Sequence, residues 1–438
     1  MNSSEPVLRR EQPLDRPSSA LQDTPWNRWL GLSSPRRLMI AAVVVHALVV
    51  LFAIVYSWRG SALGDIAIYR GWAASGFVPV APADGPAPTV YPILATLPMA
   101  LAQVLGERWF FAVWAVVVAV LNILGLAALT RRSNTTAGVA AGWWWLLFTG
   151  VMGVLAFSRI DGVTAPLVLM ALAFGLSSPG ASTALLAVGA WIKVWPVAVV
   201  TALLIAVRRR ATVLAAGVAV SLGAGLLAVV LNWGPHVLDF LGFQGNRGMQ
   251  AEATFSLPWM WLAALGLNGT RAVQNVAIGS LEVQGPGTEV MAGLMQPLLV
   301  VAVGAVAALA LAGLRTVARR DGDRTALMLW TALSLTAVLI VFNKVGSPQF
   351  VLWLGPVVAA GLAHDWIAWR RAAWLVMATA AVTLLVFPVL FQAIVHAQVH
   401  AVLVLTVRDL LLLAVLVLGV SRLVRIARGP AREPLTQP

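Results

Sequence analysis

One segment of the sequence, GDIAIY, combines residue types that are suited to acid–base chemistry. Asp65 and Tyr69 lie four positions apart, so they share one face if the segment is helical. A carboxylate at a water–lipid boundary can accept the proton of a hydroxyl group that acts as a nucleophile. The alternative is that Asp65 only caps the helix from a solvated loop. We take Asp65 as the candidate general base, with Tyr69 and the adjacent Arg70 as candidate substrate contacts.

Three further segments place cations in apolar surroundings. They are FSRIDG with Arg159, WIKVWP with Lys193 and NKVGSPQF with Lys344. An ionisable group near the centre of a bilayer costs about 2.5–3.5 kcal/mol on insertion scales, so each is a candidate for a functional role. We expect the three cations to converge on an anion, because a phosphate in a low-dielectric site needs charge-assisted donors. Asp161 and Gln349, in the same segments, are candidate substrate contacts.

Structural alternatives stay open for these cations. Arg159 and Asp161 would form an ion pair that holds a tight turn. Lys193 would pair with Asp161, or it and Lys344 would be unrelated interfacial lysines that extend toward the headgroups.

Other charged patterns are weaker candidates. Asp321-Gly322-Asp323 resembles a metal–nucleotide motif but lies in an arginine-rich loop, where a solvated turn is expected. His396 and His400 lack the glutamate of the H-E-x-x-H zinc motif. We therefore predict no metal and no cofactor. Arg408 and Asp409 form either a buried structural pair or part of a cavity.

The composition indicates which elements must position these residues. Of the 438 residues, 60% are hydrophobic and 11% are charged, and the mean hydropathy is +0.87. Soluble domains have about 25% charged residues, so the chain is an integral membrane protein. The net charge of +13 could indicate nucleic acid binding, but it follows instead from arginine-rich loops on one side of a membrane. With no cysteine, disulfides and thiolate chemistry are excluded.

Ten apolar stretches are long enough to predict full crossings, each of about 20 residues when ideal. They are residues 38–58, 109–129, 137–157, 162–177, 211–231, 291–314, 325–342, 350–363, 372–393 and 401–420. If the arginine-rich loops are cytoplasmic, an even number of crossings must separate Arg132 from Arg208. Residues 182–207 must then enter and return as two half-helices broken at Trp195-Pro196. By the same rule, residues 91–105 form an interfacial or re-entrant helix.

The expected organisation is an all-α polytopic membrane protein with both termini cytoplasmic. Residues 1–37 form a cytoplasmic tail, residues 38–426 a single transmembrane domain and residues 427–438 a second cytoplasmic tail. The loops 59–108 and 232–290 lie outside, and long loops often carry function. Asp65, Arg159, Lys193 and Lys344 then share the extracytoplasmic side of the plasma membrane.

Taken together, the segments resemble the GT-C glycosyltransferases. Their order is GDIAIY, Tyr91-Pro92, SRIDG, ALLAVGAWIKVWP and NKVGSPQFVLWLGP. Within that class, the sequence is similar to family 87, the actinobacterial polyprenyl-phosphate-dependent mannosyltransferases of phosphatidylinositol mannoside and lipomannan synthesis. The resemblance implies a multi-helix bundle with an outward-facing site and a lipid-phosphate sugar donor. It also implies a catalytic acidic residue in the first outer loop, which corresponds to Asp65.

The expected function is therefore an inverting transfer of mannose from a polyprenyl phosphate to a hydroxyl group of a lipid or cell-envelope glycan. The partners are these two substrates and membrane lipids, without nucleic acid. Two alternatives stay open. One is an arabinofuranosyltransferase of the same fold, and the other is a transporter or lipid flippase in which the same charges line a substrate path.

Overall fold

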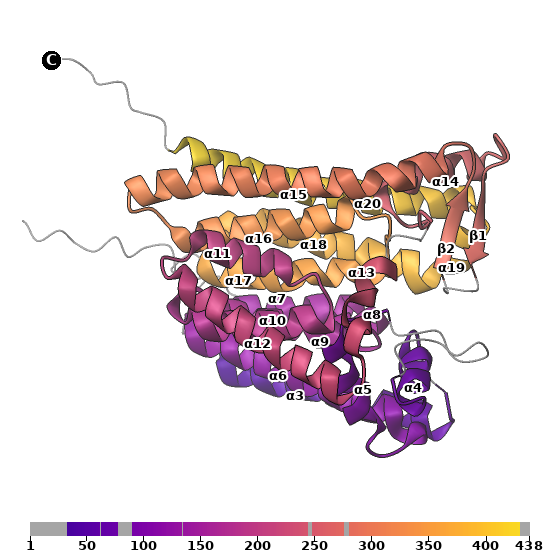
Figure 1. Cartoon of the computed structure of the whole chain (residues 1–438), viewed down its shortest axis with the longest axis horizontal. Coiled ribbons are helices and arrows are strands. Elements are labelled where there is room, and N and C mark those ends of the chain that lie inside the picture. Colours follow the sequence, from indigo (N-terminus) through magenta and orange to yellow (C-terminus); the bar gives the residue numbers. More distant parts are fainter. Residues whose placement is uncertain are drawn as a thin grey trace, which may run out of the picture.

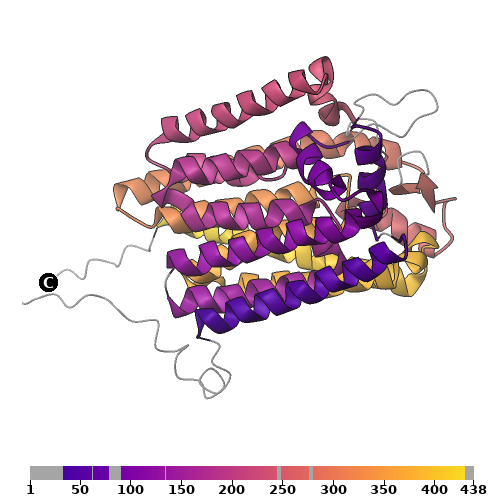
Figure 2. The same ribbon diagram turned by 90° about the horizontal axis from the view of Figure 1, so that it is seen from below.

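Long apolar helices form most of the protein. The computed structural model describes residues 33–61, 63–77, 90–133, 135–243, 248–275 and 280–429. The helices lie side by side in a bundle, and small elements gather at one end of it (Figures 1 and 2).

Within these ranges, seven helices are long and apolar enough to cross a membrane. They are α3 (Pro35–Trp58), α6 (Phe110–Ser133), α12 (Arg210–Val230), α15 (Thr288–Arg319), α16 (Arg324–Val341), α18 (Trp366–Leu384) and α20 (Val399–Arg428).

Three shorter crossings complete the bundle. They are α7 (Thr136–Met152) followed by α8 (Val154–Phe157), then α9 (Asp161–Phe174) with the 3₁₀ turn Gly175–Ser177, and the 3₁₀ turn Pro348–Trp353 followed by α17 (Leu354–His364). The second and third are about 25 Å long at 1.5 Å per residue, and the first is somewhat longer, so all three are close to the hydrocarbon thickness. The seven long helices and these three shorter ones make ten crossings, the number predicted from the sequence.

The arginine-rich loops all lie at one end of the bundle, which we call the arginine end. Arg132 donates to Ser178 at 3.2 Å, Arg208 pairs with Asp321 at 3.3 Å, and His364 contacts Asp323 at 2.6 Å. These contacts join five different helix ends or connecting loops. The arginine end is at the left in Figures 1 and 2.

The segment 182–207 is broken as predicted. It forms α10 (Pro179–Ile192) and α11 (Val197–Ala206). Ser178, before α10, contacts Arg132, and the carbonyl oxygen of Ala206 accepts from Arg324 at 2.8 Å. Both open ends of this hairpin therefore lie at the arginine end. Lys193 is in an extended conformation at the break.

The central and peripheral helices differ in burial. In the most apolar segment of α16, 78% of the residues are buried inside the protein. The corresponding share is 22% in α3 and 17% in both α12 and α15. The peripheral helices instead expose large aliphatic side chains such as Leu48, Leu222 and Val301. An apolar outer surface of this extent requires lipid around it, so the protein is a multi-pass membrane protein.

The end opposite the arginine end carries the two long loops, both of which contain ordered elements. The first holds α4 (Ile66–Ala74), α5 (Thr96–Gln103) and the 3₁₀ turns Ile93–Ala95 and Glu107–Trp109. The second holds α13 (Asp239–Phe243), α14 (Leu257–Ala264), the 3₁₀ turns Gly234–Leu238 and Thr254–Ser256, and an antiparallel hairpin of β1 (Arg271–Asn275) and β2 (Ser280–Gln284). A π-helical segment, Leu385–Val389, and α19 (Phe391–Val395) lie before α20.

Candidate active site

Asp65 stands at the N-cap position of α4 but does not cap it. Its carboxylate makes no capping hydrogen bond. Instead it forms an ion pair with Arg159 and accepts a hydrogen bond from the Tyr69 hydroxyl at 3.2 Å. The capping interpretation of this side chain is therefore wrong. The i, i+4 placement of Asp65 and Tyr69 on one helical face is confirmed.

Tyr69 connects α4 to the FSRIDG segment. Its hydroxyl accepts from the backbone N–H of Ile160 at 3.1 Å and lies 3.5 Å from the hydroxyl of Tyr91. Burial raises the pKa of Tyr69 and of Tyr91 above the ordinary tyrosine value. Both phenols therefore stay protonated and act as hydrogen-bond donors beside Asp65.

A glycine permits this close approach. Gly64 has a φ of +58°, and a Cβ atom there would lie 2.9 Å from the hydroxyl oxygen of Ser158. Only glycine adopts this conformation without strain and also leaves room for the neighbouring segment. The glycine of GDIAIY therefore lets Asp65 reach Arg159.

Arg159 does not pair with Asp161, contrary to the turn-holding ion pair considered above. Asp161 begins α9, so its side chain points into the bundle, while Arg159 turns toward Asp65. Burial by itself would lower the pKa of Arg159, but the Asp65 carboxylate together with Tyr69 and Tyr91 outweighs it, so the pKa is raised. The guanidinium carbon lies 5.4 Å from the ring centroid of Phe387, and the buried Nε has no hydrogen-bond partner among the described residues.

Asp161 and Lys193 form a second ion pair, with Nζ 2.8 Å from Oδ2. Asp161 is fully buried and also accepts from the Trp353 indole. The pairing alternative for Lys193 is thus the one observed. Since a buried carboxylate is tolerated only with such partners, Lys193 has a structural role at the least.

Aromatic rings surround the Lys193 ammonium. Its Nζ lies 5.0 Å from the ring centroid of Phe350 and 5.6 Å from those of Tyr91 and Trp353. These are cation–π distances. Tyr91 therefore connects the two ion pairs, because its hydroxyl contacts Tyr69, which donates to Asp65, and its ring lies beside Lys193. The two ion pairs belong to one site.

The remaining predicted residues are less closely connected. Lys344 and Gln349 are buried in or just before the 3₁₀ turn that carries Phe350. The carbonyl oxygen of Lys344 accepts from the backbone of Gln250 at 2.9 Å. The side chain of Arg70, half-buried on α4, makes no hydrogen bond or ion pair with the part of the chain that the structure describes. A convergence of the Lys344 side chain with Arg159 and Lys193 stays a prediction.

The sequence did not point to several residues at this end. In the sequence, Tyr91 stands out only as part of a Tyr-Pro pair, and Trp353 and Phe387 carry no signal beyond apolar character. The segment around Gln250 was not singled out either. Its side-chain oxygen accepts from the backbone of Gly346 at 3.1 Å, which fixes the NKVGSPQF loop.

Arg408 and Asp409 are a buried structural pair. The Arg408 guanidinium contacts Asp409 at 2.7 Å and donates to the carbonyl oxygens of Glu252 and Gly346. It therefore ties two loops to α20. Burial raises the pKa of Glu252 to about 7.

The charged patterns that were weaker candidates, around Asp321–Asp323 and His396, make ordinary structural contacts. Asp321 is exposed and pairs with Arg208, while Asp323 caps α16 and contacts His364. His396 contacts the carbonyl oxygen of Gln392. Among the described residues, no group of three or more His, Asp or Glu side chains could hold a metal ion. The predicted absence of a metal or cofactor stays a prediction.

Fold and site together define a multi-pass helical membrane protein with paired carboxylates and cations at one end. A family model described as "Glycosyltransferase family 87" matches residues 89–343, which is more than half of the chain. The protein therefore belongs to glycosyltransferase family 87, as its motifs predicted. The match contains Arg159, Asp161 and Lys193, whereas Asp65 precedes it.

Two other comparisons are less informative. No curated protein matches the chain. A solved structure, described as ArnT from Cupriavidus metallidurans bound to undecaprenyl phosphate, is similar with a TM-score of 0.42 and 17% identity, over 88% of this chain and 77% of that one.

Proposed function

We propose that this glycosyltransferase moves mannose from a polyprenyl phosphate to a hydroxyl group of a lipid or cell-envelope glycan, on the outer face of the plasma membrane. The observation that carries the proposal is the arrangement around Asp65. Its carboxylate is fixed by Arg159 and Tyr69 at the end opposite the arginine end. In both contacts it accepts hydrogen bonds, as the ionised form does.

Asp65 acts as the general base of a single displacement. The acceptor hydroxyl loses its proton to Asp65 as its oxygen bonds to the anomeric carbon of the sugar. The bond from that carbon to the phosphate oxygen breaks at the same time, with inversion, and the polyprenyl phosphate leaves with its electron pair. An unassisted alcohol is a weak nucleophile, which is why a base is needed.

Cations stabilise the leaving phosphate. Arg159 has a buried Nε without a partner among the described residues, so it can donate to a phosphate oxygen while its Nη1 holds Asp65. Lys193 keeps one contact to Asp161 and has two further N–H donors, so it is the second candidate. Lys344 is the third. Charge-assisted donors of this kind replace a metal ion at a transferring group.

The substrates follow from the position of the site. It lies at the end of a lipid-embedded bundle, so a donor whose activated sugar is attached to a membrane lipid reaches it by lateral diffusion. Tyr69, Arg70, Asp161 and Gln349 stay candidates for contacts to the sugar or acceptor. The transporter alternative loses support, because the chain belongs to a glycosyltransferase family.

The experiment that tests the proposal compares donors. Membranes that contain the protein would be supplied with labelled polyprenyl-phosphate mannose or with the corresponding arabinose donor. We expect label transfer from the mannose donor, and its loss in the Asp65→Asn variant. Transfer from the arabinose donor alone would assign the protein to the arabinofuranosyltransferases of the same fold. Transfer from neither donor would contradict the proposal.

A further inference from the structure

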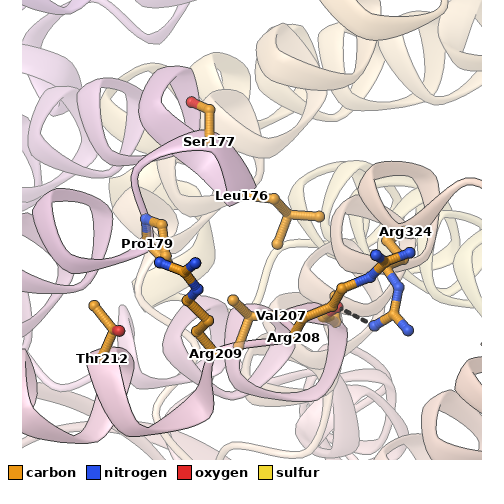
Figure 3. A pocket seen from close by; sticks show the side chains of 9 residues that line it. Leu176, Ser177, Pro179, Val207, Arg208, Arg209, Thr212 and Arg324 are labelled. Carbon is orange, nitrogen blue, oxygen red and sulfur yellow. Dashed lines mark hydrogen bonds between the residues drawn. The ribbon is translucent and has the colours of Figure 1, made fainter.

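A cavity lined by arginines lies at the arginine end, far from the candidate active site. It has a volume of about 470 Å³ and is bounded by the two open ends of the α10–α11 hairpin. Arg208, Arg209 and Arg324 line it, together with Ser177, Pro179 and Thr212 (Figure 3).

The cavity is strongly cationic. Figure 3 shows Arg209 on one side of the space and Arg208 with Arg324 on the other. Arg324 is fixed by its hydrogen bond to the carbonyl oxygen of Ala206, and Arg208 has only an exposed contact to Asp321. The side chain of Arg209 makes no hydrogen bond or ion pair within the described ranges. Among the described residues no carboxylate lines the cavity, and the one ion pair of its arginines is the exposed contact of Arg208 to Asp321.

The helix that forms one wall of the cavity, α12, also carries an apolar stripe on its exposed side. Thr212, on the first turn of α12, lines the cavity, and Leu214, Val218, Leu222 and Leu226 follow at intervals of four on the same helix. These four side chains are between 56% and 69% exposed. Because residues four apart share a helical face, they form a continuous strip that faces lipid.

We propose that this cavity binds the phosphate headgroup of an anionic membrane phospholipid, whose acyl chains lie along the stripe on α12. Basic pockets between transmembrane helices are suited to anionic headgroups, and an arginine near a membrane surface favours such lipids. The stripe distinguishes a lipid from free phosphate, since inorganic phosphate gains nothing from an apolar surface. This site is independent of the glycosyl transfer proposed above.

The position of the cavity predicts what binding does. Pro179 begins α10 and Ala206 ends α11, so a phosphate held between the arginines joins both ends of the broken helix pair. A ligand that binds only the folded state stabilises it in proportion to its occupancy. We therefore expect a bound anionic lipid to raise the thermal stability of the protein.

The test uses the full-length protein in detergent micelles. Phosphatidylglycerol, phosphatidylcholine or inorganic phosphate would be titrated, with bound lipid measured by native mass spectrometry and the unfolding midpoint Tm by light scattering. Variants Arg209→Gln and Arg210→Gln form a matched pair, because the two arginines are exposed neighbours and only Arg209 lines the cavity. We expect phosphatidylglycerol alone to bind and raise Tm. Arg209→Gln should weaken its binding about fivefold, and Arg210→Gln should change it little.

Three outcomes would overturn the proposal. Equal binding of phosphatidylcholine would show that the charge has no role. An equal rise in Tm with inorganic phosphate would identify a free-anion site. Equal effects of Arg209→Gln and Arg210→Gln would show that general surface charge, and not this cavity, attracts the lipid. Arg208→Gln repeats the test at a second exposed side chain of the cavity.

Discussion

At the scale of single residues, the Asp65 carboxylate is the most informative group. Arg159 and Tyr69 hold the carboxylate in place, and it can still accept a proton. Asp65→Asn keeps the size and most of the hydrogen bonding but removes the basicity. We expect kcat to fall by a factor of roughly 10²–10⁴, the usual contribution of a general base. Initial rates with saturating donor would measure it.

The control for this change is Asp239→Asn. Asp239 lies at the same end of the bundle, half-exposed and paired with His236, and it has no contact to the site. We expect near-normal kcat from this variant. If a well-folded Asp65→Asn protein turned over as fast as the Asp239→Asn control, Asp65 would not be the base.

Lys193 has a structural and a proposed functional role that mutations can separate. Lys193→Met leaves the buried Asp161 without its cation, which typically costs about 3–5 kcal/mol of stability. We expect a clear fall in Tm. The double variant Lys193→Met with Asp161→Asn removes both charges and should recover most of the lost stability.

The recovered double variant then reports on donor binding. If Lys193 contacts the phosphate, the KM of the double variant for the donor stays high. Its kcat/KM then stays at least about tenfold below normal, which corresponds to a loss of about 1.4 kcal/mol in transition-state stabilisation. If activity returns together with stability, Lys193 only pairs with Asp161 and does not belong to the donor site. Steady-state kinetics on the stable double variant distinguish the two.

Glu252 predicts a pH dependence of stability. Burial raises its pKa to about 7, against the opposing effect of Arg408, from an ordinary value of 4.5. Between these two values the folded protein binds more protons than the unfolded chain, so stability falls as pH rises from about 4.5 to 7 and then levels off. In Glu252→Gln we expect this decline of Tm with pH to be weaker. Parallel slopes in the two proteins over that interval would contradict the assignment.

At the scale of elements, glycines allow separate loops to dock around the site. A Cβ atom on Gly346 would overlap the backbone of Glu252. Gly346→Ala should therefore displace the NKVGSPQF loop, lower Tm and raise the donor KM. Gly293→Ala is the matched control, since a Cβ there meets nothing within 4 Å and alanine favours the helix α15. Equal Tm values in the two variants would show that the loop has room to adjust.

The sequence predicted elements better than it predicted partners. Hydropathy gave the ten crossings, and the positions of arginines required the break at Trp195-Pro196, because both signals are local and strong. The partners of Arg159 and Asp161 were not predictable. Only one residue separates them in the sequence, yet Asp161 begins a helix and Arg159 faces α4. Tyr91 and Trp353 join the site only through tertiary docking, which no spacing records.

At the scale of the whole molecule, charge separates the two ends of the bundle. Arginines gather at one end, while the described carboxylate–cation pairs of the candidate site lie at the other. The positive-inside rule predicts that the arginine end is cytoplasmic. In that orientation Asp65 and its partners would face the outside, as the proposed function requires, and the cationic cavity would face the cytoplasmic leaflet, which is rich in anionic lipid.

This orientation predicts the labelling of single cysteines, which is simple because the chain has none of its own. Gln284→Cys lies on the exposed end of β2, and Gly322→Cys lies in the exposed loop between α15 and α16. In intact cells, an impermeant thiol reagent should modify Gln284→Cys and spare Gly322→Cys. Both should react in permeabilised cells, which controls for accessibility. The reverse pattern would place Asp65 in the cytoplasm, where nucleotide-activated sugars are available, and would remove the reason for a lipid-linked donor.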